Sequence, residues 1–292
     1  MLFEDPSFLK IYLLSQINRS MPIFSSPQLA MASCDNCKKG AVLPGEPTGT
    51  MVNGAYLAAG PEGNTSRAII LLTDIFGLPL INCKIIADNI SKRLQCDVWV
   101  PDLFNGKPPI TVDKLKVPER VGEKIKWFSL IINMLPSVPA MLFNRPTVAY
   151  PRVENFVKEL QNKKEYGKLG AVGYCFGGTL AVTMAGTDLL NSVVICHPGS
   201  VTEEAVQAMK VPSAWACAEE DMGFKPEIRR KAEELLASRQ GKDNFVEYEF
   251  KDYKGTVHGF AARPNLAYPE VKAGYEGAFE QTIEWFQKTL PV

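Results

Sequence analysis

The sequence lacks features that would point to a membrane, a nucleic acid or a repeat architecture. Its 292 residues contain no run of about 18 or more apolar residues, so we expect no transmembrane helix. Lys plus Arg and Asp plus Glu each total 32, and the formal net charge is zero. Nucleic-acid-binding proteins normally carry a basic excess, so we expect neither a nucleic acid nor a membrane as a partner. The chain also has only two histidines, which narrows the choice of a catalytic base.

The seven cysteines do not form the pattern of a disulfide-stapled secreted protein. Their number is odd and the chain is long, so we expect free thiols in a reducing compartment and a cytoplasmic location. Cys34 and Cys37 form one C-x-x-C pair, but no second cysteine pair accompanies it. We therefore expect them to be loop thiols, and we expect no metal site.

Residues 1–50 are predicted to form an N-terminal extension followed by an irregular segment. Their apolar run FLKIYLL follows Glu4 and Asp5, which is atypical of a targeting signal, and Met21 and Met31 are alternative starts. Residues 51–292 are predicted to form one α/β domain. An insertion is expected near residues 113–150, where prolines interrupt short helical patches. These prolines are Pro136, Pro139, Pro146 and, just beyond the insertion, Pro151.

The domain alternates short apolar runs with longer segments of helical periodicity. Strands are expected at 68–73, 96–102, 169–174, 191–199, 211–221 and 245–250. Helices are expected at 80–94, 117–134, 152–163, 176–186, 226–239 and 270–289. This alternation predicts an α/β fold with a mostly parallel central sheet and helices on both faces.

The most informative peptide is Gly173-Tyr174-Cys175-Phe176-Gly177-Gly178, which lies between an expected strand and an expected helix. A nucleophile on such a tight turn needs small neighbours, because strand and helix crowd it. The helix N-terminus favours a thiolate at Cys175, and the Phe176 N–H is the natural oxyanion donor. The alternative is a glycine-rich turn that holds a buried structural cysteine.

The other members of a catalytic triad follow in the order that an α/β-hydrolase fold requires: nucleophile, acid, histidine. His258 comes after the last expected strand and is predicted to be the general base. Asp221, which follows the strand at 211–218, is the preferred acid; Glu220 and Asp252 are its competitors. His197 precedes any plausible acid and is expected to be a site-wall residue or a bystander.

Three elements together resemble the dienelactone hydrolase family, in its fungal branch. They are Leu71-Leu72-Thr73-Asp74-Ile75-Phe76-Gly77, the Cys175 peptide, and His258-Gly259-Phe260. The resemblance implies cofactor-independent hydrolysis of small esters or lactones by a Cys-Asp-His triad. It also implies that Asp74 helps to form the thiolate, although the family carries a longer glutamate there. The Ile75 N–H would complete the oxyanion hole.

The same resemblance implies basic residues that hold a substrate carboxylate, with Arg263 and Lys107 as the candidates here. Tyr174 and His197 are further candidates for substrate contact. The expected partner is a small-molecule ester or lactone, and the chain is expected to be a monomer or a homodimer. Two alternatives stay open. One is a secondary-metabolite (polyketide) pathway hydrolase acting on a thioester, lactone or related intermediate. The other is a non-catalytic small-molecule-binding protein on the same fold.

Overall fold

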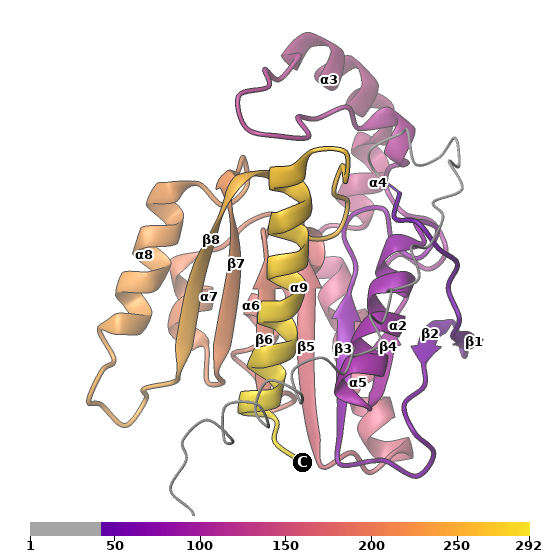
Figure 1. Ribbon diagram of the computed structural model, residues 1–292, viewed down its shortest axis with the longest axis vertical. Coiled ribbons are helices and arrows are strands. Elements are labelled where there is room, and N and C mark those ends of the chain that lie inside the picture. The colour runs from indigo at the N-terminus through magenta and orange to yellow at the C-terminus, as the bar shows by residue number, and fades with distance from the viewer. Residues whose placement is uncertain (1–41) are drawn as a thin grey trace, which may run out of the picture. The chain divides into compact units, whose positions relative to one another are not determined.

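A computed structural model describes residues 42–292, in which one sheet of eight strands organises the fold (Figure 1). The strand order is β1-β2-β4-β3-β5-β6-β7-β8. The strands are β1 (Thr50–Val52), β2 (Ala55–Ala58), β3 (Arg67–Leu72), β4 (Asp97–Val100), β5 (Lys168–Tyr174), β6 (Ser192–Cys196), β7 (Ser213–Glu220) and β8 (Tyr248–Val257). The predicted extension at 1–41, with Cys34 and Cys37, lies outside the described residues.

All strand pairs from β4 to β8 are parallel, whereas β1 and β2 are antiparallel additions at one edge. The β1–β2 hairpin was not predicted from the sequence. Its turn is Asn53-Gly54, with φ values of 49° and 82°. An Asn-Gly pair accepts positive φ at both positions and is the preferred sequence for a two-residue hairpin turn.

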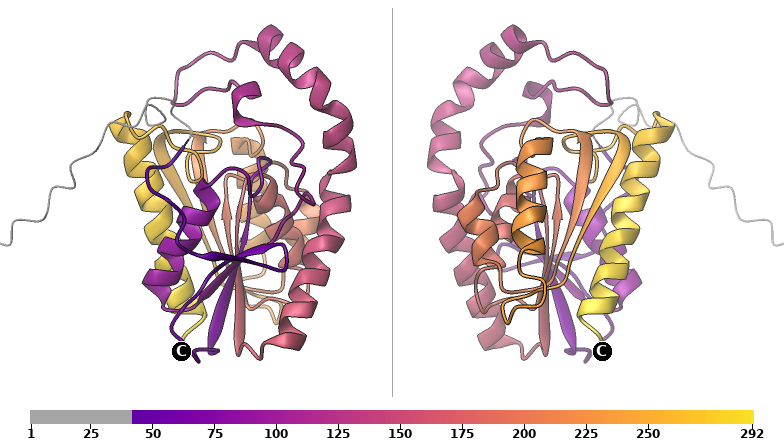
Figure 2. Two further views of the ribbon diagram at one scale, coloured as in Figure 1. Left: turned by 90° about the vertical axis from the view of Figure 1, so that its right-hand side faces the viewer. Right: turned by 90° about the vertical axis from the view of Figure 1, so that its left-hand side faces the viewer.

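The helices cover both faces of the sheet (Figure 2). One face packs against α2 and α9, and the other packs against α5, α6, α7 and α8. Their bounds are α2 (Asn82–Leu94), α5 (Pro146–Lys163), α6 (Phe176–Met184), α7 (Glu203–Ala208), α8 (Pro226–Ala237) and α9 (Pro269–Thr289). The side chains of β3 alternate between the two cores: Ile69 packs on the α2–α9 side and Ile70 on the other. The predicted α/β architecture is confirmed.

Several predicted boundaries were wrong. The expected helix at 117–134 begins only at Trp127, and α7 was not expected. The prolines do not interrupt the helices as predicted: Pro136, Pro139 and Pro146 stand at the first helical positions, where a missing N–H costs nothing. Pro151 lies inside α5, and the helix continues through it.

A cap lies beyond the carboxyl ends of the parallel strands (Figures 1 and 2). It consists of the η2 turn (Val112–Lys114), an irregular segment, α3 (Trp127–Met134), η3 (Leu135–Ser137) and α4 (Val138–Phe143). Phe128, Ile131 and Phe143 of the cap are exposed.

Within residues 42–292, no single helix has the length and apolarity needed to cross a membrane. The segment Trp127–Phe143 and α5 pass that test only as a bent pair, on length and composition alone.

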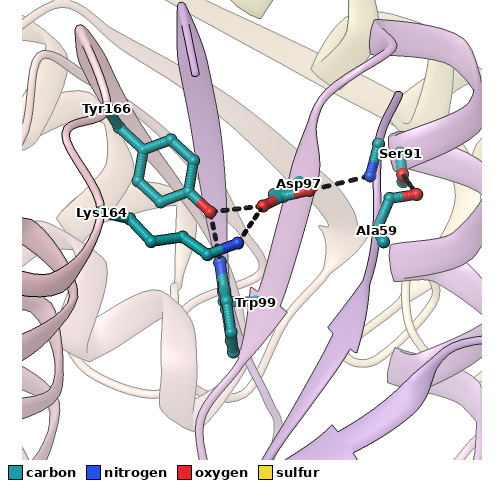
Figure 3. A network of polar contacts seen from close by, with 7 residues as sticks. Ala59, Ser91, Asp97, Trp99, Lys164 and Tyr166 are labelled. Carbon is teal, nitrogen blue, oxygen red and sulfur yellow. Dashed lines mark hydrogen bonds and ion pairs between the residues drawn. The ribbon is translucent and has the colours of Figure 1, made fainter. Parts of the chain in front are cut away.

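At the end of the sheet opposite the cap, a polar network surrounds Asp97, the first residue of β4 (Figure 3). Its carboxylate accepts hydrogen bonds from the Tyr166 hydroxyl, from Lys164 Nζ at 2.9 Å and from the Gly60 amide at 2.9 Å. Burial opposes ionisation of Asp97, but these donors lower its pKa. Because Lys164 and Tyr166 lie between α5 and β5, the network holds the end of α5 against the sheet.

Candidate active site

Cys175 stands on a sharp turn between β5 and α6, at the carboxyl edge of the sheet. Its φ of 53° and ψ of −109° lie outside the regions that non-glycine residues normally occupy. Its amide donates to the Cys196 carbonyl at 3.1 Å, and its carbonyl accepts from the Gly199 amide at 2.9 Å. These two hydrogen bonds to the end of β6 and the loop after it hold the strained turn in place. A Cβ on Gly177 would lie 2.1 Å from the Leu72 carbonyl oxygen. The flanking glycine is therefore a steric requirement of this turn.

His258 and Asp221 meet next to this turn, although they come from different loops. Asp221 follows β7 and His258 follows β8. Nδ1 of His258 lies 2.8 Å from Oδ1 of Asp221. The same oxygen accepts from the amides of Gly223 at 2.7 Å and Phe224 at 3.0 Å, which fixes the carboxylate. The Asp221 side chain is 2% exposed and the imidazole is 16% exposed.

The charges of these groups reinforce one another. Burial by itself would lower the pKa of His258, but the charge of Cys175, hydrogen bonds to Asp221 and Cys175 and the charge of Asp221 outweigh it and raise that pKa to about 10. Burial likewise opposes ionisation of Asp221, yet its hydrogen bond and ionic attraction to His258 lower its pKa. The site is therefore suited to an imidazolium at His258 beside the Asp221 carboxylate.

The two competing acids make other contacts. Glu220 is exposed at the end of β7 and accepts a hydrogen bond from the Gly122 amide at 3.4 Å. Asp252 pairs with Arg229. Neither forms a hydrogen bond with His258 among the described residues, whereas Asp221 does.

Asp74 is buried beside the site and pairs with Arg263, an interaction that sequence reasoning missed. Its Oδ2 accepts from Nε of Arg263 at 3.0 Å, and its Oδ1 accepts from the Phe76 amide at 3.1 Å. The Arg263 guanidinium also lies over the Phe76 ring, 4.8 Å from the ring centroid. Burial raises the pKa of Asp74 in spite of the opposing charge of Arg263. Both carboxylate oxygens of Asp74 thus accept a hydrogen bond.

The two expected oxyanion donors flank Cys175 from different loops. Phe176 is the first residue of α6, and the first N–H groups of a helix have no partner within it. Ile75 lies on the turn after β3 and lines the same cavity as Cys175.

Three residues expected to contact substrate do not line that cavity. Lys107 is exposed. Tyr174 and His197 are buried, and the His197 ring packs against that of His258 with centroids 5.2 Å apart. Neither ring nitrogen of His197 has a hydrogen-bond partner within residues 42–292, and burial lowers its pKa well below the ordinary value. Of the four candidates for substrate contact, only Arg263 is among the described residues that line this cavity.

The cavity has a volume of about 400 Å³ and lies between the cap and the Cys175 turn. Cys175, Asp221, His258 and Arg263 line it from the sheet side. The cap side is lined by Leu115, Val117, Pro118, Glu123, Ile125, Leu130 and Met134. These cap residues were missed because the sequence carries no signal for where an insertion folds back. Among residues 42–292, no group of three or more His, Cys, Asp or Glu side chains is placed to hold a metal ion.

Comparison with known proteins identifies the family of this chain. The model of the dienelactone hydrolase family matches residues 54–290. "Hydrolase tropI" of Talaromyces stipitatus is 32% identical, over 90% of this chain and 98% of that protein. A carboxymethylenebutenolidase homolog of Homo sapiens is 28% identical, over 81% of this chain and 87% of that protein.

Among solved structures, a putative dienelactone hydrolase from Klebsiella pneumoniae superposes with a TM-score of 0.57 at 12% identity, over 80% of this chain and 92% of that one. At that identity the likeness concerns the fold alone, and the fold is that of the α/β-hydrolases.

Proposed function

Because this chain belongs to the dienelactone hydrolase family, we propose that it hydrolyses small-molecule esters or lactones through Cys175, Asp221 and His258. The observation that carries the proposal is the convergence of these three side chains from separate loops on one cavity. A glycine-rich turn around a merely structural cysteine would need no such convergence, and neither would a binding protein.

In the first step the Cys175 thiolate attacks the substrate carbonyl carbon. A carbon–sulfur bond forms, and the carbonyl oxygen takes up negative charge near the N–H groups of Phe176 and Ile75. The ester or lactone carbon–oxygen bond then breaks. The leaving oxygen takes a proton from His258, and Cys175 is left as a thioester.

The second step follows from the electrostatics of the first. The charge and hydrogen bond of Cys175 are among the contributions that raise the pKa of His258. Both are lost when the sulfur becomes acylated, so the imidazole becomes a competent base near neutral pH. It removes a proton from water, the water oxygen attacks the thioester, and the thiolate leaves. Asp221 holds the ring orientation throughout.

Mass spectrometry after acid quenching tests this proposal directly. With a p-nitrophenyl ester as substrate, we expect an acyl group on the peptide that contains Cys175. His258→Ala should accumulate or retain that adduct, because water is no longer activated. Cys175→Ala should form no adduct, and its rate of ester hydrolysis should fall by about 10³-fold or more. Cys217→Ala is the matched control, since that thiol is buried in β7. Full activity in Cys175→Ala would refute the assignment.

A further inference from the structure

The walls of the cavity are mostly apolar. Ile75 and Val257 line it from the sheet side, and Val117, Ile125, Leu130 and Met134 line it from the cap. Apolar substrate surface that packs against such walls is removed from water, which stabilises the complex. The cavity therefore favours an acyl or alcohol group with an extended apolar surface.

The one guanidinium that lines this cavity is already paired. Arg263 is 8% exposed and donates to Asp74, whose side chain is 1% exposed. The Phe76 ring lies against the same guanidinium. A substrate carboxylate would have to compete with a buried carboxylate that the fold already holds in place.

Besides Asp221, two carboxylates line the cavity, those of Glu220 and Glu123. The basic side chains of the same wall, Arg263 and His258, already pair with Asp74 and Asp221. Glu220 forms no ion pair with another described residue, and its carboxylate accepts a hydrogen bond from the Gly122 amide at 3.4 Å. Glu123 lies 3.4 Å from Nε of Arg120, which does not line the cavity. Solvent screens the exposed Glu220 and the partly exposed Glu123, but a carboxylate bound in this cavity would still lie beside both negative charges, and like charges repel. The adjoining cavity contains Lys116, but it is lined by Asp113 and Glu119 as well.

From these contacts we infer that the site takes neutral, lipophilic substrates and discriminates against carboxylates, with Glu220 and Glu123 as the specificity-determining residues. This inference rests on the hydrolytic function proposed above. It has a consequence for turnover, because hydrolysis converts a neutral ester into a carboxylic acid that is ionised at neutral pH. The same two carboxylates that admit the neutral substrate repel the anionic product and promote its release.

A pair of esters with one leaving group tests the inference. In mono-p-nitrophenyl adipate, a carboxylate replaces the terminal methyl group of p-nitrophenyl hexanoate, and the reacting carbonyl is unchanged. We expect kcat/KM for the hexanoate to exceed that for the adipate by about tenfold or more, beyond the ratio of their uncatalysed hydrolysis rates. Hexanoate ion should inhibit only weakly.

The variants Glu220→Gln and Glu123→Gln keep the shape of the side chains and remove their charge. Each variant should bring kcat/KM for the adipate closer to kcat/KM for the hexanoate. Each should also strengthen inhibition by hexanoate ion. Glu227→Gln is the matched control, because Glu227 lies on α8 and lines a different cavity. It should leave both quantities unchanged.

The outcomes separate the two proposals. Equal kcat/KM for both esters, with acylation of Cys175 intact, would overturn the substrate inference and leave the hydrolytic function standing. A preference that persists unchanged in both glutamine variants would overturn the role given to Glu220 and Glu123. Absence of acylation with either ester would remove the hydrolytic function and, with it, the inference.

Discussion

Nε of Arg263 donates to Oδ2 of Asp74 at 3.0 Å, joining two residues 189 positions apart in the chain. The pair links the turn after β3 to the loop that carries His258, so it fixes the two sides of the site relative to each other. Both side chains are buried. Removing one charge of such a pair leaves the other uncompensated in a poorly solvated environment.

Asp74→Asn should therefore lower the free energy of unfolding by about 3–5 kcal/mol, measured by chemical denaturation. The double variant Asp74→Asn/Arg263→Met should recover part of this loss, because it removes the stranded charge. Glu280→Gln is the control: it breaks the Arg93–Glu280 pair, whose side chains are 47% and 48% exposed. That change should cost about 0–1 kcal/mol. An Asp74→Asn protein as stable as the parent would show that the buried pair does not stabilise the fold.

The sequence sufficed for the parallel sheet and for the triad candidates because both depend on local patterns. Each strand is an apolar run, and each candidate follows a strand at the edge where such sites form. The Asp74–Arg263 pair was not predicted from the sequence. Asp74 was expected to act on the thiol, and Arg263 was expected to bind a substrate carboxylate. Both residues were singled out, but their mutual contact depends on the packing of distant loops.

The arrangement of the cap also depends on packing that a local sequence pattern does not predict. Its prolines suggested interrupted helices, whereas three of them begin helices. Nothing in the local pattern distinguishes the inward side chains of Leu130 and Met134 from the outward side chain of Phe128. All three are apolar. Which of them face the cavity is decided only by how helix α3 packs over the loops that carry Cys175, Asp221 and His258.

The raised pKa of His258 predicts a specific pH dependence of stability. Its folded-state pKa is about 10, against an ordinary value of 6.5. The stabilisation it contributes is therefore fully present below about pH 6.5 and is lost as the pH rises through about 10. Chemical denaturation across this window should show the decline in the parent protein and a flatter profile in His258→Gln. A decline of equal slope in both proteins would contradict the prediction.

The same pKa should depend on Cys175, whose charge and hydrogen bond help to raise it. In Cys175→Ala, NMR titration of the His258 ring should give a clearly lower pKa than in the parent. Cys217→Ala, which removes a thiol buried in β7, should leave the titration unchanged. An unshifted His258 pKa in Cys175→Ala would mean that the sulfur is uncharged beside the imidazole.

The nucleophile turn should not tolerate Gly177→Ala. The added Cβ would lie 2.1 Å from the Leu72 carbonyl oxygen, which is backbone and cannot move aside cheaply. We expect a loss of about 3 kcal/mol or more in stability, together with slower acylation of Cys175. Gly186→Ala, just beyond the C-terminal end of α6, is the control, because the nearest atom to its added Cβ is 3.1 Å away. If both variants were equally stable, the close approach of α6 to β3 would not be the reason for the glycine.

Opposite sides of helix α3 should contribute differently to substrate binding. Leu130 lines the cavity that holds Cys175, whereas Phe128, on the same helix, is 80% exposed. Leu130→Ala removes apolar surface from the substrate site, so KM for p-nitrophenyl hexanoate should rise by about three- to tenfold with little change in kcat. Phe128→Ala deletes a larger side chain yet should leave KM unchanged. The reverse order of effects would mean that the helix presents its other side to the substrate during catalysis.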